Sequence, residues 1–119
     1  MTDPNCVFCK IVRGEIPATK IHDDAEVMAF HDIRPQAPVH ILIMPKAHIA
    51  TLYDAEAAHQ SALGKMLAIA GRLAREAGAA DGFRAIINNG RVGHQEVYHV
   101  HMHVLGGPEP LGPMLQRKR

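Results

Sequence analysis

Three histidines stand at alternate positions near the end of this chain of 119 residues. His99, His101 and His103 are separated by single apolar residues in the stretch "HVHMHVLGG". In an extended strand, side chains two residues apart point to the same face, so the imidazoles would share one face and the apolar residues the other. Neutral imidazole can act as a nucleophile, a metal ligand or a proton carrier near neutral pH. The spacing therefore predicts a chemical site on one face of a core strand.

Two cysteines at C-x-x-C spacing, Cys6 and Cys9, are the second candidate for chemistry. The start of the chain, "MTDPNCVFCK", lacks the long apolar core of a signal peptide, and no run is apolar enough to span a bilayer. We therefore expect a cytoplasmic protein with no membrane partner. In a reducing compartment this cysteine spacing indicates metal binding or redox chemistry rather than a structural disulfide.

The composition is that of an ordinary globular domain. The chain is 47% hydrophobic and 21% charged, with a formal net charge of +1. Its length predicts a single domain over residues 1–119, with terminal tails at about 1–5 and 112–119. The near-neutral charge gives no indication of a nucleic-acid partner, and the basic run Arg117–Arg119 is interpreted as a solvated end.

Local patterns predict the elements that must position these residues. A short helical turn is expected over residues 8–13, because Gly14 and Pro17 prevent its continuation. Four apolar runs bounded by turn residues predict strands at residues 27–30, 39–45, 83–88 and 97–105.

A longer helix is expected between Asp54, a suitable N-cap, and Gly78, a suitable C-terminal residue. Its apolar residues recur at helical spacing: Leu63, Met66, Leu67, Ala70, Leu73, Ala74 and Ala77. Strands joined by short loops, with one inserted helix, indicate an α+β fold in which the helix covers one face of an antiparallel sheet. We expect it to cover the apolar face of the last strand and to leave the histidine face open to a ligand.

The segment "HVHMHVL" has the form His-φ-His-φ-His-φ-φ, where φ is hydrophobic, and it resembles the signature of the histidine triad (HIT) superfamily of nucleotide hydrolases and transferases. The stretches "FCKIVRGEIP", "AFHDIRPQAPVHILIMPKAHI", "INNG" and "GHQEVYHVHMHVLGG" resemble its Hint branch, and "QEVYH" and "LGPM" resemble its bacterial members. The resemblance implies a HIT-like fold with an antiparallel sheet of about five strands, one long helix and a short N-terminal helix. It also implies a homodimer whose sheets join across the two-fold axis.

The Hint branch consists of purine nucleoside phosphoramidases. The resemblance therefore implies an enzyme that cleaves the P–N bond of purine nucleoside 5′-phosphoramidates, of the AMP-lysine or aminoacyl-adenylate type, through a nucleotidyl-histidine intermediate. It would bind AMP or GMP and require no cofactor for catalysis. A dinucleoside polyphosphate hydrolase and a nucleotidyl transferase of the same superfamily share the covalent step and are alternatives.

The resemblance gives the histidines distinct roles. His101 matches the nucleophile, whose Nε2 would attack the α-phosphate while its Nδ1 proton points to an acceptor such as a main-chain carbonyl. His103 matches the residue that contacts the phosphate and supplies a proton to the leaving amine. His99 and His40 match supporting histidines. Because the sequence shows no carboxylate cluster suited to Mg²⁺, main-chain N–H groups and imidazoles would hold the phosphate charge.

Asp32 matches the carboxylate that accepts hydrogen bonds from the ribose hydroxyls, although an aspartate in "DIRPQ" could equally cap a turn. The residues that match the base pocket are apolar and would otherwise be interpreted as core: Val7, Phe8, Ile11, Ile16, Phe30 and Ile33. Asn88 matches a phosphate contact. The loop that would pass the α-phosphate consists of His94, Gln95, Glu96 and Val97.

Two positions depart from the family's pattern. His94 stands where the family usually has glycine, which would constrain the loop backbone or bring an extra imidazole to the phosphate. Glu96 replaces the serine of the animal relatives, and its carboxylate would repel a phosphate unless it binds an ammonium of the leaving group. The residues after Leu111 match a segment that closes over the leaving-group side in the dimer.

Zinc-containing relatives that begin with the same "CxFCK" pattern imply a structural zinc site. Its four ligands would be Cys6, Cys9, His48 and His99. Two thiolates and two imidazoles suit a tetrahedral zinc ion, which would hold the N-terminal turn beside the catalytic strand. The cysteines could instead be thiols without a metal.

Two further alternatives concern the function of the whole protein. One is a metal-binding protein in which the three triad histidines hold one ion, and the other is a nucleotide-binding module without catalysis.

Overall fold

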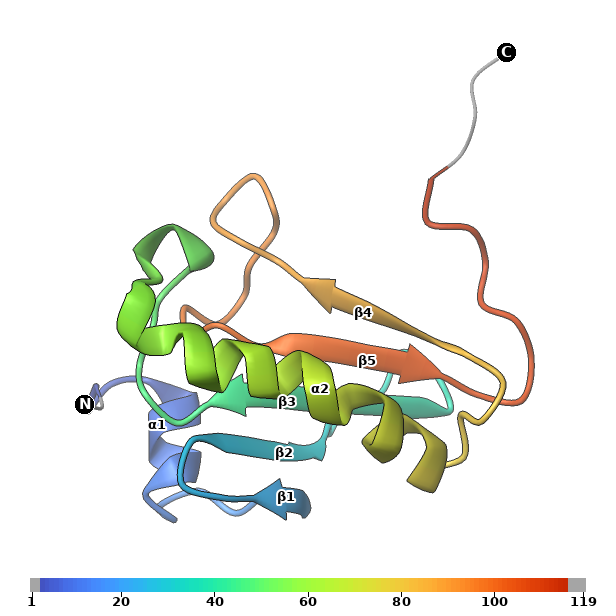
Figure 1. Cartoon of the computed structure of the whole chain (residues 1–119), viewed down its shortest axis with the longest axis horizontal. Helices are drawn as coiled ribbons and strands as arrows, with labels where there is room; N and C mark the ends of the chain where they lie inside the picture. The colour runs from blue at the N-terminus through green and yellow to red at the C-terminus, as the bar shows by residue number, and fades with distance from the viewer. Residues whose placement is uncertain (1–2, 116–119) are drawn as a thin grey trace.

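The computed structural model describes residues 3–115, so the basic run Arg117–Arg119 lies outside the described residues. Within that range, two α-helices and five strands follow one another (Figure 1): α1 (Val7–Val12), β1 (Lys20–Asp23), β2 (Val27–His31), β3 (Val39–Pro45), α2 (Gln60–Glu76), β4 (Phe83–Ile87) and β5 (Met102–Gly106). No helix in the described part of the chain is long and apolar enough to cross a membrane.

The five strands form one antiparallel sheet in the order β1-β2-β3-β5-β4. This sheet confirms the predicted α+β class. Because β5 lies between β3 and β4, its His103 is held on both sides, with Leu42 and Ile86 as register partners. The sequence patterns do not predict β1, since "KIHD" is short, partly exposed and without apolar alternation.

Alternating side chains of the sheet fill two separate apolar clusters. On β3, Val39, Ile41 and Ile43 belong to the α2 cluster, which lies between the sheet and α2. The buried residues of the α1 cluster, on the opposite face, are Phe8, Ile11, Met28, Phe30, Leu42 and Met44. Helix α2 crosses the sheet over β3 and β5 (Figure 1). Its cluster includes the apolar residues of the histidine motif, as predicted: Val100, Met102 and Val104.

The histidine face is less open than predicted, because α1 covers part of it. Phe8 and Ile11 of α1 are buried in the α1 cluster. His99 is 0% exposed and His101 is 6% exposed. The sequence pattern predicts α1 as a helical turn but does not place it on the sheet. Its apolar side chains are removed from water there, which favours this packing.

Helix α2 begins later than predicted. Thr51 and Asp54 form a capping box around a 3₁₀ turn at Leu52–Asp54, in which Asp54 Oδ2 accepts from the backbone N–H and the hydroxyl of Thr51. Asp54 therefore caps this short turn and not the long helix. The apolar stripe of α2 is buried at four positions, Met66, Ala70, Leu73 and Ala74. Leu67, which was expected in that stripe, is 63% exposed.

Strand β5 begins at Met102, so the first half of the predicted last strand is wrong. The register pairs Ile43 with Met102 and would bring Val100 opposite Pro45. Proline has no N–H to donate, so the ladder cannot continue at that point. Val100 donates its N–H to the carbonyl oxygen of Ile49 instead. The residues that precede Met102 are therefore irregular backbone.

Gly106 is expected to be intolerant of a side chain. A Cβ atom there would lie 2.7 Å from the Cβ atom of Ala79 and 3.3 Å from the carbonyl oxygen of Gly82. We expect Gly106→Ala to lower the free energy of unfolding by about 1–3 kcal/mol, the usual cost of overpacking. Urea denaturation measures this change.

Gly64→Ala is the matched control, because nothing lies within 4 Å of its Cβ position. It lies inside α2, where alanine is more favourable than glycine by roughly 0.5–1 kcal/mol. A Gly106→Ala variant that is as stable as the native chain would contradict the packing described here.

Candidate active site

His101 is held by two contacts that leave one ring nitrogen available. Its Nδ1 lies 2.7 Å from the carbonyl oxygen of His99. Because a carbonyl oxygen only accepts, Nδ1 carries the proton and Nε2 has the lone pair. The ring of Phe8 packs edge-on against the imidazole, with 4.9 Å between centroids. Buried groups therefore fix the orientation of the His101 ring.

A chain of hydrogen bonds fixes the tautomers of His40 and His103. The backbone N–H of Gln36 donates to His40 Nδ1 over 3.0 Å, so the proton of neutral His40 lies on Nε2. His40 Nε2 lies 2.9 Å from His103 Nδ1 and donates to it. His103 therefore carries its own proton on Nε2, where it can donate to a ligand. Sequence reasoning did not identify Gln36, because only its backbone takes part.

These three imidazoles are neutral at neutral pH. Burial lowers the pKa of His40 and of His101 below the ordinary histidine value of 6.5. Burial, together with the neighbouring imidazoles of His101 and His40, lowers the pKa of His103 to about 4. The site thus offers a lone pair on His101 and an N–H donor on His103.

Asp32 follows β2 directly and lies beside His40. Its Oδ1 accepts the backbone N–H of Arg34 over 2.8 Å, which is the turn-capping role that the sequence left open. Its Oδ2 lies 3.4 Å from His40 Nε2. One carboxylate oxygen therefore shapes the turn, and the other faces the histidines, where it can accept from a ligand hydroxyl.

The residues expected around a nucleotide base divide between core and surface. Three are buried in the α1 cluster: Phe8, Ile11 and Phe30. The other three are more accessible, with Ile16 at the edge of that cluster, Val7 40% exposed and Ile33 90% exposed. The three buried residues form the core beneath this surface, and the three accessible residues are available to contact a planar ligand.

Gln95 holds the loop between β4 and β5 in place. Its side-chain amide donates to the carbonyl oxygens of Ala50 and Val97. The amide oxygen accepts from the backbone N–H of Gly90. These bonds occupy the buried side chain, and the backbone N–H of Gln95 donates to the carbonyl oxygen of Gly90 over 3.0 Å, so Gln95 shapes the loop.

The other predicted loop residues have different surroundings. His94 adopts a left-handed backbone conformation, with φ of 60°, which glycine adopts at less cost. Glu96 is exposed, and its charge acts on His101 and His103. Asn88 is half-buried. The left-handed conformation of His94 gives a physical reason for the glycine that the family pattern has there.

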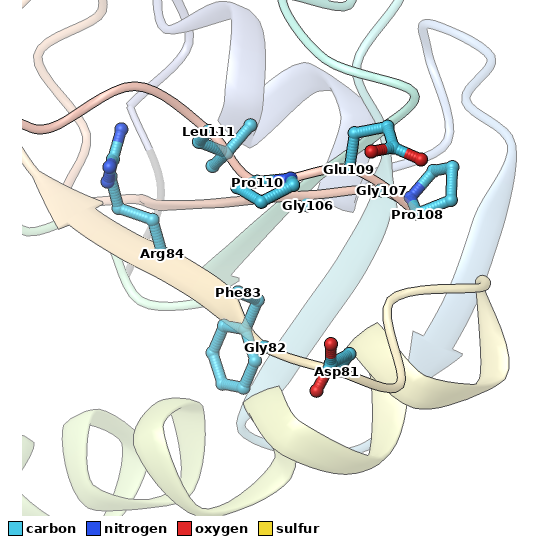
Figure 2. A pocket seen from close by; sticks show the side chains of 10 residues that line it. All are labelled: Asp81, Gly82, Phe83, Arg84, Gly106, Gly107, Pro108, Glu109, Pro110 and Leu111. Carbon is cyan, nitrogen blue, oxygen red and sulfur yellow. The ribbon is translucent and has the colours of Figure 1, made fainter.

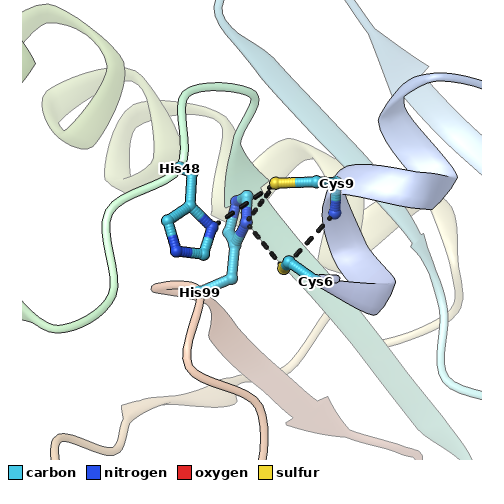
Figure 3. A group of neighbouring side chains, drawn as sticks. All are labelled: Cys6, Cys9, His48 and His99. Atoms are coloured by element: carbon cyan, nitrogen blue, oxygen red, sulfur yellow. Dashed lines mark hydrogen bonds between the residues drawn. The ribbon is translucent and has the colours of Figure 1, made fainter. Parts of the chain in front are cut away.

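Cys6, Cys9, His48 and His99 lie together beside α1 (Figure 3), with one ligand atom of each within 4.8 Å of the others. Both cysteine sulfurs lie 3.5 Å from His99 Nδ1. Cys9 Sγ also lies 3.4 Å from His48 Nδ1. His99 Nε2 donates to the carbonyl oxygen of Pro45 over 2.7 Å, so His99 Nδ1 directs its lone pair at the sulfurs.

This cluster fits a tetrahedral zinc ion. Zn–S bonds of about 2.3 Å and Zn–N bonds of about 2.0–2.1 Å place sulfur and nitrogen ligands about 3.6 Å apart. The observed sulfur–nitrogen distances are 3.4 Å and 3.5 Å. The Asp3 carboxylate lies 3.9 Å from His48 Nε2, and such outer partners orient ligating histidines. Sequence reasoning missed Asp3, since no local pattern links it to His48.

The triad histidines do not converge on one ion. His99 Nδ1 faces the cysteines, His101 Nδ1 donates to the backbone, and His103 Nδ1 accepts from His40. Within residues 3–115, one other group of potential ligands exists, formed by Asp32, His40 and His103. The proton on His40 Nε2 opposes metal binding there. This geometry argues against the alternative in which three histidines hold one ion.

A cavity is lined by Leu52, Tyr53 and Asn89, and two further cavities lie in different parts of the molecule. One, of about 520 Å³, lies between the cysteine–histidine cluster and the β4–β5 loop, with Cys6, His48, Glu96 and Val97 in its lining. Figure 2 shows the other, of about 260 Å³, formed by residues 81–84 and 106–111. Its residues lie around the end of β5 and include none of the predicted site residues. The cavity of about 520 Å³ therefore joins two parts of the predicted site.

Comparison with known proteins identifies the family. Residues 13–109 match the HIT domain family. The chain belongs to the HIT domain family. This HIT protein is 53% identical over 113 residues to the purine nucleoside phosphoramidase of Escherichia coli strain K12, covering 94% of each protein. It is 46% identical over 109 residues to the 14 kDa zinc-binding protein of Zea mays, covering 90% of this chain and 85% of the relative.

Solved structures of other HIT proteins have the same fold. A HIT family hydrolase from Legionella pneumophila superposes with a TM-score of 0.85 at 48% identity, covering 92% of this chain and 98% of that one. A HIT family hydrolase from Clostridium thermocellum gives a TM-score of 0.89 at 41% identity, covering 96% and 100%. These similarities confirm the predicted superfamily and the predicted HIT-like fold.

The free energy of unfolding of this HIT protein is expected to decrease as the pH decreases, because His103 binds protons more weakly in the folded protein than in the unfolded chain. Its pKa is about 4 in the folded protein against an ordinary 6.5, so the unfolded chain binds more protons between these values. This contribution to stability is complete above about pH 6.5 and is lost as the pH falls toward 4. In His103→Asn, the free energy of unfolding should therefore depend less steeply on pH over this range.

Urea denaturation at a series of pH values measures both slopes. His94→Asn, which removes an exposed imidazole and keeps a residue type that tolerates a left-handed backbone, is the matched control. Equal slopes for the native chain and His103→Asn would show that His103 does not titrate as described.

Proposed function

We propose that this protein hydrolyses the P–N bond of purine nucleoside 5′-phosphoramidates through a covalent intermediate on His101. The observation that carries the proposal is the buried His101 imidazole, whose Nδ1 proton is committed to the His99 carbonyl and whose Nε2 lone pair is available. The name of the 53% identical relative, purine nucleoside phosphoramidase, supports this substrate class. The nucleotides bound would be AMP and GMP.

In the first step, His101 Nε2 attacks the α-phosphorus, and the P–N bond breaks. The products are a nucleotidyl-histidine and an amine. Positive charge develops on the imidazole as its lone pair forms the new bond. The carbonyl oxygen of His99, 2.7 Å from Nδ1, stabilises that charge through a charge-assisted hydrogen bond. Catalysis needs no cofactor in this proposal.

The leaving amine takes its proton from His103. The bond from His40 to His103 Nδ1 leaves Nε2 as the atom that faces a ligand. A bound anionic phosphate favours one additional proton on the His40–His103 pair, and one proton passes from Nε2 to the amine nitrogen as the P–N bond breaks. Water then attacks phosphorus, the bond between phosphorus and His101 Nε2 breaks, and the water returns one proton to the His40–His103 pair. The 5′-monophosphate is released, and His101 is regenerated.

The nucleotide would be held by polar and apolar contacts. Asp32 Oδ2 would accept from the ribose hydroxyls, since Oδ1 already accepts from Arg34. In the loop at residues 94–97, the backbone N–H groups of His94 and Gln95 already donate to the carbonyl oxygens of Arg91 and Gly90. The main chain at Glu96 and Val97, with Asn88, would therefore hold the α-phosphate. The accessible apolar residues would contact the base: Val7, Ile16 and Ile33.

Glu96 would select leaving groups that carry a positive charge. Its side chain is exposed, and its charge acts on the imidazoles of His101 and His103. A carboxylate in that position disfavours a phosphate, unless an ammonium group on the substrate compensates for the repulsion. This arrangement favours lysine-like amines over uncharged ones.

A homodimer would join two sheets through β4. This strand is the last in the sheet order, and the strand that it pairs with in the described part of the chain is β5. An edge strand offers a row of backbone donors and acceptors to a second chain. Residues 112–115, the part of the C-terminal segment that the structure describes, would close over the leaving-group side of the site in that dimer; residues 116–119 lie outside the described residues.

A structural zinc ion would be held by Cys6, Cys9, His48 and His99. The sulfur–nitrogen distances and the His99 tautomer support this assignment, as does the name of the zinc-binding relative from Zea mays. When bound, zinc would supply a rigid link rather than Lewis-acid chemistry. It would hold the His99 ring, and through it the carbonyl that orients His101.

Replacement of the nucleophile tests the proposed reaction. We expect His101→Ala to lose hydrolysis of an adenosine 5′-phosphoramidate that carries a fluorogenic amine, by on the order of 10⁴-fold or more, because no covalent intermediate can form. Calorimetry should show that the variant still binds AMP. His59→Ala, which removes a histidine just before α2, should keep the native rate. A His101→Ala variant with a tenth of the native activity would overturn the covalent mechanism.

Elemental analysis tests the metal site. Protein purified without a histidine tag or chelator should contain about one zinc ion per chain, as a four-ligand structural site requires. Cys6→Ser should lower the zinc content, and His59→Ala should not, because His59 lies outside the cluster. A content below about a tenth of an equivalent, with Cys6→Ser as stable as the native chain, would exclude a structural zinc.

A further inference from the structure

Cys6 and Cys9 are the only cysteines in the chain and take no direct part in the proposed hydrolysis. We infer that they form a peroxide-oxidisable dithiol, and that their oxidation to a disulfide releases the metal held with His48 and His99. The inference rests on the proposed zinc site. The C-x-x-C pair would then have both kinds of chemistry that its spacing indicates. The reduced thiols would bind a metal, and the same thiols could be oxidised to a disulfide.

The two sulfur atoms are placed to form a disulfide. Cys6 is the N-cap of α1, and Cys9 lies in the first turn of that helix, a separation at which side chains are neighbours. Both sulfurs lie 3.5 Å from the same atom, His99 Nδ1, and within 4.8 Å of each other. A disulfide therefore requires the side chains to approach but no rearrangement of the sheet.

Cys6 is the thiol that an oxidant reaches first. Its side chain is partly exposed, whereas Cys9 is 0% exposed. Cys6 also lines the cavity of about 520 Å³ beside the β4–β5 loop, which is ample for hydrogen peroxide. Accessible thiols are oxidised before buried ones. Cys9 is therefore placed as the resolving thiol, protected from solvent and adjacent to Cys6.

The reaction balances with hydrogen peroxide as the oxidant. The Cys6 thiolate attacks one peroxide oxygen, the O–O bond breaks, and Cys6 becomes a sulfenic acid as hydroxide leaves. The Cys9 sulfur then attacks the Cys6 sulfur, and the S–O bond breaks to give the disulfide and a second hydroxide. The two thiolates lose two electrons, and the hydroxides become water on protonation. After this step only His48 and His99 would remain as ligands, too few to hold a structural zinc ion.

Loss of the metal reaches the catalytic histidine through His99. The His99 ring keeps its hydrogen bond to the Pro45 carbonyl, but its Nδ1 no longer coordinates a metal ion. The carbonyl of His99 is the acceptor that orients His101. Helix α1 also carries Phe8, whose ring lies 5.9 Å from the His99 ring and 4.9 Å from the His101 ring, centroid to centroid. Oxidation therefore changes the support of the nucleophile without touching a reacting group.

The experiment exposes zinc-loaded native protein to hydrogen peroxide. Zinc release is followed with a chromophoric chelator, free thiols are titrated, and the intact mass is measured. With two cysteines in the chain, the thiol titration reports on this pair alone. Cys6→Ser and Cys9→Ser are treated in parallel, because neither can form an intramolecular disulfide. Phosphoramidate hydrolysis is measured before oxidation, after oxidation, and after reduction in the presence of zinc.

We expect zinc release to follow the loss of both thiols, with a mass loss of two hydrogens per chain. Hydrolysis should slow by on the order of 10-fold or more, the usual size of effect when a group that orients a functional histidine is removed. It should recover on reduction in the presence of zinc. The serine variants should gain oxygen and show no loss of hydrogens.

Native protein that keeps its zinc and both thiols, at a peroxide concentration that oxidises free dithiothreitol, would overturn the inference. Oxidation of the thiols to sulfinic acids without a disulfide would also overturn it. Neither result would argue against a zinc site in the reduced protein. Protein isolated without zinc would instead overturn the zinc site itself, and this inference with it.

Discussion

The hydrogen bond from His101 Nδ1 to the carbonyl oxygen of His99 is the contact on which the rest of the site depends. It fixes the tautomer of His101 and turns the Nε2 lone pair away from the backbone. The carbonyl is itself well positioned, because the His99 ring is bonded to Pro45 and faces the two cysteine sulfurs. The Pro45 backbone, the His99 ring and the two thiols therefore all help to position the His99 carbonyl oxygen, which orients His101, the proposed nucleophile.

The end of the β3–β5 ladder makes this contact available. In a continued strand, the carbonyl of His99 would be a candidate for inter-strand bonding. Pro45 cannot donate to a strand partner, and the ladder begins only at Met102. The carbonyl of Pro45 accepts from the His99 ring, and the carbonyl of His99 accepts from the His101 ring. A single proline thus converts a stretch of predicted strand into a support for two histidines.

The sequence predicts the parts of this structure that depend on local periodicity. The β3 strand follows from a continuous apolar run that ends at a proline. The four buried positions of α2 and the apolar side of the histidine motif follow from repeats of three to four and of two residues. Strand β1 and the position of α1 do not, because tertiary packing decides both. The family resemblance anticipates the His101 tautomer, with Nδ1 bonded to a main-chain carbonyl. The tautomers of His40 and His99 are beyond sequence reasoning, since they depend on backbone groups of Gln36 and Pro45. His94 is intermediate: its departure from glycine is visible in the sequence, and its left-handed backbone only in the structure.

The proposed catalytic histidines and the two cysteines lie in different parts of the chain, and His48 and His99 lie in the same part as the catalytic histidines. The family match over residues 13–109 contains His40, His101 and His103 and the bonds that fix their tautomers. Cys6 and Cys9 precede that match, on a helix that packs against the same face. The cysteines therefore supply no hydrogen-bond donor or acceptor to the proposed hydrolysis. They affect only how rigidly the His99 carbonyl is held. Because the cysteines affect only the orientation of the His101 ring, their oxidation would change the rate of the proposed hydrolysis without abolishing it. A redox-sensitive cysteine pair can therefore be added to this fold without changing the reaction itself.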